Sequence, residues 1–115
     1  MSNDVDMKIT DNTELLEKAT SEAIAKALEA VGITAEAYAK LLCPVDTGRL
    51  RNSISHDVRA DDNTVYIGTN VEYAPYVEMG TSRTKAQPFL QPAATGHTEE
   101  YKQIFEQQLQ QSQND

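Results

Sequence analysis

A row of apolar residues at helical spacing, ended by a proline, constrains the fold of this chain more than any other feature. Between Ile24 and Leu42 apolar side chains recur at intervals of three and four residues, which places them on one stripe of an α-helix. Charged side chains occupy the opposite side, and Pro44 cannot continue the helix. We therefore expect one long amphipathic helix over residues 13–42. Its apolar stripe consists of Ile24, Leu28, Val31, Ala35, Tyr38 and Leu42.

Polar residues stand at the start of this helix, and a glycine lies inside it. Asp11 or Asn12 is suited to cap the first turn, because short polar side chains accept hydrogen bonds from the free N–H groups there. Gly32 is an unfavourable residue within a helix. The apolar stripe nevertheless keeps its phase across Gly32, so the pattern favours one continuous helix over two.

The middle of the chain carries the alternating pattern of a β-hairpin. Ile54, His56 and Val58 alternate with polar residues, which is typical of a strand with one buried face. A turn-forming run follows at residues 61–63, and the β-branched run 64–69 can return as the second strand. We expect a small antiparallel sheet built on this hairpin.

A short helix is predicted directly after the hairpin. Tyr73, Tyr76 and Val77 share helical spacing. Pro75 suits the first turn of a helix, and Gly80 suits its end. These residues predict a helix of about two turns.

The rest of the chain reads as a loop followed by a final helix. Residues 80–87 are polar and form the expected loop, and residues 88–90 are expected to be extended. The last helix begins between Pro92 and Thr98, with Gly96 obscuring where. Its apolar stripe consists of Tyr101, Ile104, Phe105 and Leu109.

Together these elements predict an α+β fold. The order is a long N-terminal helix, a small antiparallel sheet, a short middle helix and a C-terminal helix. A chain of 115 residues suits a single domain, which we place over residues 13–110. Residues 1–12 and 111–115 are expected to be flexible.

The charge of the chain limits its partners. The net charge is −8, and the excess acid lies in the two flanks, while all the arginines lie within residues 48–97. An acidic protein is a poor general binder of nucleic acid or of an anionic membrane, because both attract positive surfaces. No segment is apolar enough to span a bilayer, and the first residues lack the pattern of a secretion signal.

The residues that most often carry catalysis do not form a recognised pattern. His56 and His97 are 41 residues apart, and Cys43 is the sole cysteine. We expect His56 on the inner face of a strand, His97 exposed in a loop, and Cys43 in a structural role. The sequence therefore predicts no catalytic residue, metal or cofactor. A small hydrolase using His56 with a nearby Ser or Asp is a remote alternative.

Three short blocks occur in order along the chain. The first is PVDTGRLRNSI over residues 44–54, the second is YAPYVEMGT over residues 73–81, and the third is AQPFLQPA over residues 86–93. The first block joins the end of a helix to the start of a strand. The residues expected to shape that turn are Pro44, Asp46, Thr47 and Gly48.

In these blocks the chain resembles the phage tail-component family typified by gene product ten of coliphage Hong Kong ninety-seven. The family pattern is a long helix, then P-x-D-T-G-x-L-x-x-S-I, a hairpin, Y-A-x-Y-x-E-x-G-T, a variable loop, and P-F-L-x-P-A before a final helix. The similarity in layout covers roughly residues 13–110. Met79 stands where an aromatic residue is common in the family, and Gly96 interrupts the usual final helix.

The resemblance implies a structural protein of a tailed phage or prophage without catalytic activity. Such proteins act at the neck or upper tail as rings that join head and tail or complete the tail. The implied partners are further copies of the chain, neighbouring connector proteins, and tail-terminator or tail-tube proteins. DNA would only pass through the channel. The implied location is the virion, after assembly in the host cytoplasm.

The polar loop and the segment after it are the expected contact region. The residues that we expect to touch a neighbouring subunit or partner are Arg83, Lys85, Pro88, Phe89 and Leu90. An alternative from a different class is a prophage-encoded regulatory module that inhibits a host protein. The acidic composition and the lack of a catalytic pattern also allow that function.

Overall fold

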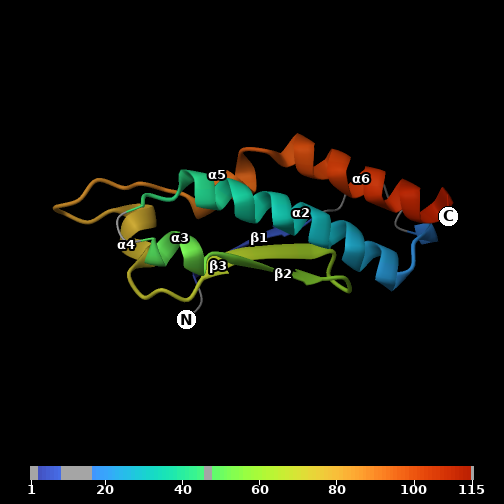
Figure 1. The fold of residues 1–115 in the computed structure, drawn as a ribbon, viewed down its shortest axis with the longest axis horizontal. Helices are drawn as coiled ribbons and strands as arrows, with labels where there is room; N and C mark the ends of the chain where they lie inside the picture. Colours follow the sequence, from blue (N-terminus) through green and yellow to red (C-terminus); the bar gives the residue numbers. More distant parts are fainter. Residues whose placement is uncertain (1–2, 9–16, 46–47, 115) are drawn as a thin grey trace.

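The long helix α2 (Ser21–Leu42) lies over one face of a three-stranded sheet in the computed structural model, which describes residues 3–8, 17–45 and 48–114 (Figure 1). Helix α6 (Thr98–Asn114) packs beside α2 on the same side of the sheet. The molecule is elongated, with extents of 52 × 21 × 21 Å. This arrangement confirms the α+β fold class, with a long N-terminal helix, a small antiparallel sheet and a C-terminal helix.

Helix α2 confirms the central part of the predicted stripe and corrects its start. Leu28, Val31 and Ala35 are fully buried, and the helix runs unbroken through Gly32. The chain is extended at Thr20, whose side-chain oxygen accepts a hydrogen bond of 3.1 Å from the N–H of Ala23. The helix that continues to Leu42 therefore begins at Ser21, eight residues after the predicted start. The caps proposed at residues 11 and 12 lie outside the described residues.

The predicted hairpin is present, and a third strand joins it. Strands β2 (Ser55–Arg59) and β3 (Thr64–Thr69) pair antiparallel. Asn63 in the turn has a φ of 52°, a left-handed conformation that Asn tolerates. Strand β1 (Asn3–Lys8) pairs with the other edge of β3 and gives the order β1-β3-β2. Residues 3–8 thus form a strand, where we expected a flexible segment over residues 1–12.

Short helices fill several of the connections. They are α3 (Arg49–Ser53), α4 (Ala74–Met79) and α5 (Leu90–Thr95). Helix α4 was predicted, and it ends at Gly80, whose φ of 78° is readily adopted only by glycine. Helices α3 and α5 were not predicted. Helix α6 begins at Thr98, within the predicted window, and continues to Asn114, beyond the predicted boundary at residue 110.

The core lies between α2, the inner face of the sheet, α5 and α6. A half-buried contact between the helices supports it: the Tyr38 hydroxyl donates to the Glu100 carboxylate, and the rings of Tyr38 and His97 stack with centroids 3.6 Å apart. His97 was expected to be solvent-exposed, but this stacking half-buries it. The largest fully buried side chains are Tyr101, Phe89, Phe105, Leu28, Ile67, Leu109, Val31 and Val65.

His56 accounts for the glycine in the middle of α2. As expected, this side chain points from β2 toward the helix, and its ring lies on Gly32. A Cβ atom at Gly32 would be only 2.5 Å from His56 Cδ2. Glu29 and Glu36 stand three residues before and four residues after Gly32, so all three share one helix face. The ring nitrogens bond these two carboxylates, Nε2 to Glu29 and Nδ1 to Glu36.

The outer face of the sheet is not covered by the helices. Figure 1 shows the long helices on one side of the sheet only. On strand β2 every second residue is exposed, namely Ser55, Asp57 and Arg59. Among the described residues, the fold is therefore a two-layer arrangement in which the helices cover one face of the sheet.

Candidate assembly surface

Exposed apolar side chains gather at one end of the elongated molecule. Leu41 and Leu42 lie in the last turn of α2, and Val45 follows that helix. Tyr76 and Met79 lie on α4, and Met79 is as exposed as Leu41, at 80%. Figure 1 places α4 and the C-terminal end of α2 at the same end of the molecule. Adjacent exposed apolar residues of this size are typical of a surface that another protein covers.

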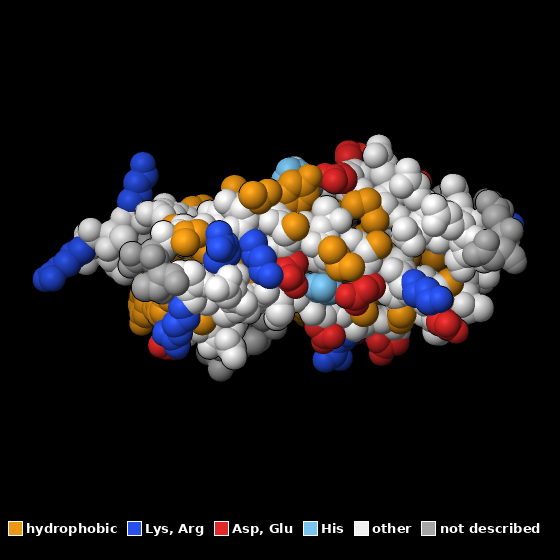
Figure 2. Space-filling model, viewed as in Figure 1, with side chains coloured by type: hydrophobic (Ala, Val, Ile, Leu, Met, Phe, Trp, Pro, Cys, Tyr) orange, Lys and Arg blue, Asp and Glu red, His pale blue; other side chains and the backbone are white. Residues whose placement is uncertain are grey.

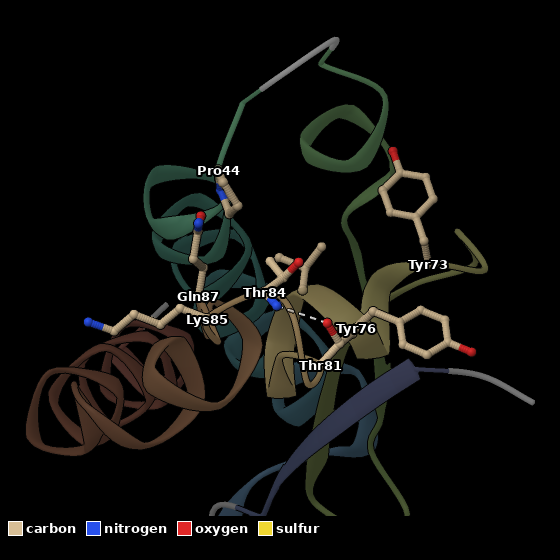
Figure 3. Close-up of a pocket in the computed structure, with 8 residues that line it drawn as sticks. Pro44, Tyr73, Tyr76, Thr81, Thr84, Lys85 and Gln87 are labelled. Atoms are coloured by element: carbon tan, nitrogen blue, oxygen red, sulfur yellow. Dashed lines mark hydrogen bonds between the residues drawn. The ribbon is translucent and has the colours of Figure 1, made fainter.

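A mostly apolar pocket of about 280 Å³ opens at this end (Figure 3). It lies between the segment that follows α2, helix α4 and the loop of residues 80–87. In Figure 3 the Lys85 side chain extends away from the pocket, and the Tyr76 ring points outward. The pocket is lined by Pro44, Tyr73, Tyr76, Val77, Thr81, Thr84, Lys85 and Gln87.

The loop of residues 80–87 has a defined conformation. The N–H of Thr81 donates to the Thr84 carbonyl over 2.8 Å, and the N–H of Thr84 donates to the Thr81 hydroxyl over 3.0 Å. At the base of the loop, the N–H of Gln87 donates to the Val77 carbonyl over 2.8 Å. The loop returns so close to Gly80 that a Cβ there would lie 2.7 Å from the backbone nitrogen of Ala86. These contacts hold the loop against α4.

Glu78 connects the second sequence block to the third. Its carboxylate accepts hydrogen bonds from the backbone N–H groups of Phe89, Leu90 and Gln91, over 3.1, 2.9 and 3.1 Å. These N–H groups belong to the start of α5, where a helix leaves donors unpaired. Sequence reasoning missed this role, although the glutamate of the second block was visible. Glu78 therefore fixes both ends of the loop.

The structure divides the five predicted contact residues into two groups. Arg83, Lys85 and Pro88 are exposed on the loop end. Phe89 and Leu90 are 0% and 3% exposed and belong to the core. For these last two side chains the prediction of a surface contact was wrong. The bonds from Glu78 turn the backbone inward at this point, and Leu90 begins α5 instead of continuing an extended segment.

The predicted turn after α2 is described in part. Pro44 directly follows Cys43, the residue that ends the helix, as predicted. Gly48 has a φ of 84° and stands immediately before α3, so it supplies the positive φ that we expected. Asp46 and Thr47 lie outside the described residues.

Basic groups dominate the loop end. No carboxylate occurs between Glu78 and Glu99, whereas Arg83 and Lys85 lie in that interval. Within the described part of the chain, neither cation has an ion-pair partner. The carboxylate of Glu78 is occupied by backbone N–H groups. Basic side chains project from this end in Figure 2.

The candidate catalytic groups are occupied by structural contacts. Both ring nitrogens of His56 form hydrogen bonds with carboxylates. Burial alone would lower the pKa of His56, but these bonds outweigh burial and raise it. Burial raises the pKa of the Cys43 thiol, which disfavours the reactive thiolate. Among the described residues, no His, Cys, Asp and Glu side chains group in a way that could hold a metal ion. Nor is any described helix long and apolar enough to cross a membrane.

The chain matches one known protein family over most of its length. A family model described as "Bacteriophage HK97-gp10, putative tail-component" matches residues 7–80, well over half of the sequence. The chain belongs to the HK97-gp10-like family. The match spans the first sequence block and nearly all of the second, and it confirms the predicted resemblance. No curated protein and no solved structure matches the chain. The family assignment supports a structural role in a bacteriophage tail.

Proposed function

We propose that this protein acts at the neck or upper tail of a phage particle, as a ring component that joins head to tail or completes the tail. The observation that carries this proposal is the exposed apolar and basic loop end of a molecule that is otherwise acidic. A contact between such an end and a different, acidic surface of the next copy is head-to-tail. Head-to-tail contacts form a ring when the rotation between subunits closes.

The charge of the chain suits a position around a DNA channel. With a net charge of −8, most of its surface repels the phosphate backbone. DNA therefore passes such a ring without being held by it, and the protein needs no specific nucleic-acid contact. The cations at the loop end are then available for protein contacts with the layers above and below.

The loop end is also suited to contact a connector, tail-terminator or tail-tube protein. Arg83, Lys85 and Pro88 are exposed at this end, beside the apolar pocket. A rigid loop with unpaired cations favours an acidic partner surface and loses little conformational freedom on binding. We propose the virion neck or tail as its final location, after assembly in the host cytoplasm.

Localisation within the particle tests this function. A peptide tag is added at the C-terminus, which Figure 1 places at the end of the molecule opposite the loop. Particles made with the tagged protein are incubated with gold-labelled antibody and viewed by electron microscopy. Gold at the junction of head and tail is the expected result. Gold confined to the tail tip, or particles that contain no tagged protein, would contradict the proposal.

A further inference from the structure

The open face of the sheet carries acidic groups that no described residue pairs with. In the register of the sheet, Asp6 of β1 and Asp57 of β2 stand opposite Tyr66 of β3, one on each side. Residues directly opposite one another point to the same face, so a carboxylate flanks each side of the Tyr66 ring. Both aspartates are exposed, and within the described residues neither forms an ion pair.

The shape of this face allows another protein to approach closely. Ser55 and Gly68 form the next pair along the two strands, and their side chains are small or absent. The helices of the chain lie on the opposite side of the sheet (Figure 1). Arg59 is exposed on the same face of β2, with its guanidinium 5.8 Å from the centroid of the Tyr66 ring. The result is a patch with an aromatic ring at its centre, a carboxylate on each side of the ring and one guanidinium over it. We call Asp6, Asp57, Tyr66, Ser55 and Gly68 the acidic sheet face.

The loop end offers the complementary features. Arg83 and Lys85 project as unpaired cations, and Lys85 stands at the edge of the apolar pocket. Tyr76 and Met79 are exposed beside the pocket at 62% and 80%. Two cations bordering an apolar surface match two carboxylates bordering an aromatic ring.

We propose that the loop end of one copy of this chain docks on the acidic sheet face of a second copy. The inference rests on the proposed function and names the contact between subunits. At this contact the cations of the loop end meet the two carboxylates, and apolar side chains pack beside Tyr66 and the Arg59 guanidinium that lies over its ring. The two surfaces differ, so each copy keeps a free loop end or a free sheet face until the assembly closes.

A second copy fits this surface better than nucleic acid does. The loop end carries large apolar side chains beside its cations, whereas a site for the phosphate backbone is strongly basic and polar. The chain itself supplies the acidic partner surface. Because the contact joins one loop end to one patch of a sheet, the buried surface is small, and we expect a dissociation constant on the order of 10–100 µM.

Charge reversal on each surface tests the contact. The loop variant is Arg83→Glu with Lys85→Glu, and the sheet variant is Asp6→Lys with Asp57→Lys. All four side chains are exposed, so both variants are expected to fold, which circular dichroism checks. Sedimentation velocity of the wild-type chain at about 1 mM and low salt is expected to show assemblies larger than a monomer, which dissociate as salt rises.

The expected results follow from the head-to-tail geometry. Each variant alone loses at least tenfold in affinity and stays monomeric. Mixing the two variants restores assembly, with the variants alternating, because the unchanged loop end matches the unchanged sheet face and the reversed loop end matches the reversed sheet face. A chain with all four substitutions assembles again, because opposite charges face one another once more.

Matched controls carry the same charge changes elsewhere. Lys18→Glu with Lys26→Glu controls for the loop variant, and Glu17→Lys with Glu22→Lys controls for the sheet variant; these side chains are all exposed. Both controls are expected to assemble like the wild type.

Three results would overturn the proposed contact: a wild-type chain that stays monomeric, a mixture that does not assemble, or controls that lose assembly equally. The proposed contact would also be overturned if the wild-type chain retained double-stranded DNA through its loop end in a filter-binding assay. None of these results would move the gold label from the head–tail junction, so the proposed function is tested separately.

Discussion

Substituting Gly32 by Ala is expected to destabilise the protein, although the same change stabilises most helices. Alanine is favoured over glycine inside a helix by about 1 kcal/mol. The added Cβ, however, would lie 2.5 Å from His56 Cδ2, 3.0 Å from Cγ and 3.4 Å from Cβ. Turning the ring about the Cβ–Cγ bond moves Cδ2 away but leaves Cγ at 3.0 Å, so this rotation does not remove the whole conflict. The ring or the strand must move away from the helix.

The cost follows from what that movement breaks. His56 bonds Glu29 and Glu36, and a hydrogen bond to a charged group contributes about 1.5–3 kcal/mol. The Glu29 side chain is 50% exposed, so its contribution is reduced by solvent screening. Setting a loss of about 2–3 kcal/mol against the gain in helix propensity leaves a net destabilisation of about 1–2 kcal/mol.

A double-mutant cycle with His56→Ala isolates this contact. Without the ring, Gly32→Ala is expected to stabilise the chain by about 1 kcal/mol. The two substitutions then couple by about 2–3 kcal/mol in urea unfolding followed by circular dichroism at pH 6. Ala37→Gly, on the exposed side of α2, is the control and costs about 1 kcal/mol in both backgrounds. A stabilising Gly32→Ala in the wild type, or no coupling, would refute the packing of His56 on Gly32.

Four further predictions concern the same interactions, the loop and the core. The pKa of His56 is raised in the folded protein. The stability from its ion pairs is therefore fully present below the unfolded pKa of 6.5 and is lost as the pH rises through the folded pKa. The free energies of unfolding of the wild type and His56→Gln, measured in urea across pH 5–9, should converge at the alkaline end. The pKa of Glu36 is lowered, because its bonds with His56 and Lys40 outweigh the effect of burial. Its contribution to stability is therefore present above its unfolded pKa of 4.5 and is lost as the pH falls through the folded pKa. At that low pH, Glu36→Gln should be as stable as the wild type. Glu78→Ala should lower the free energy of unfolding in urea by about 2–3 kcal/mol, and amide hydrogen exchange at the start of α5 should accelerate. Glu78→Gln keeps one acceptor oxygen and should lose roughly half as much stability. Equal losses in the two variants would show that the charge alone matters. Phe89→Ala should cost about 3–5 kcal/mol, since the ring is fully buried, and a thermal melt like that of the wild type would contradict its place in the core.

The elements predicted from sequence are those whose signals are local. The stripe around Leu28 and Val31 repeats over several turns, and the hairpin combines an alternating pattern before its turn with a β-branched run after it. Gly80 ends α4 for a reason contained in its own backbone. Each of these signals can be recognised without knowledge of the rest of the fold.

The missed features depend on contacts between distant segments. Strand β1 has only Val5 and Met7 as alternating apolar residues, and it exists as a strand because β3 offers a free edge. Helix α5 begins where the Glu78 carboxylate accepts its N–H groups, which no pattern near residue 90 reveals. The start of α2 was placed too early, because Asp11 and Asn12 were taken as the N-cap, whereas the chain is extended at Thr20 and the helix begins after it.

The candidate assembly surface and the acidic sheet face were likewise predicted only in part from the sequence. The exposed cations of the loop could be named from sequence, since polar loops usually stay at the surface. The acidic sheet face could not, because Asp6 and Asp57 come together only through the pairing of both strands with β3. Nor did sequence separate Phe89 and Leu90 from their exposed neighbours, because apolar residues after a loop suit either a contact or a core.

The central claim, a role at the junction of head and tail, is tested most directly by electron microscopy of particles that lack this protein. A nonsense mutation in its gene is introduced into the phage, and the particles from a lysate are imaged. We predict DNA-filled heads beside separate tails of normal length, with joined particles restored when the protein is supplied from a plasmid. Aberrantly long or absent tails would contradict a joining role and place the protein in tail assembly. Normal, infectious particles would contradict the structural role altogether.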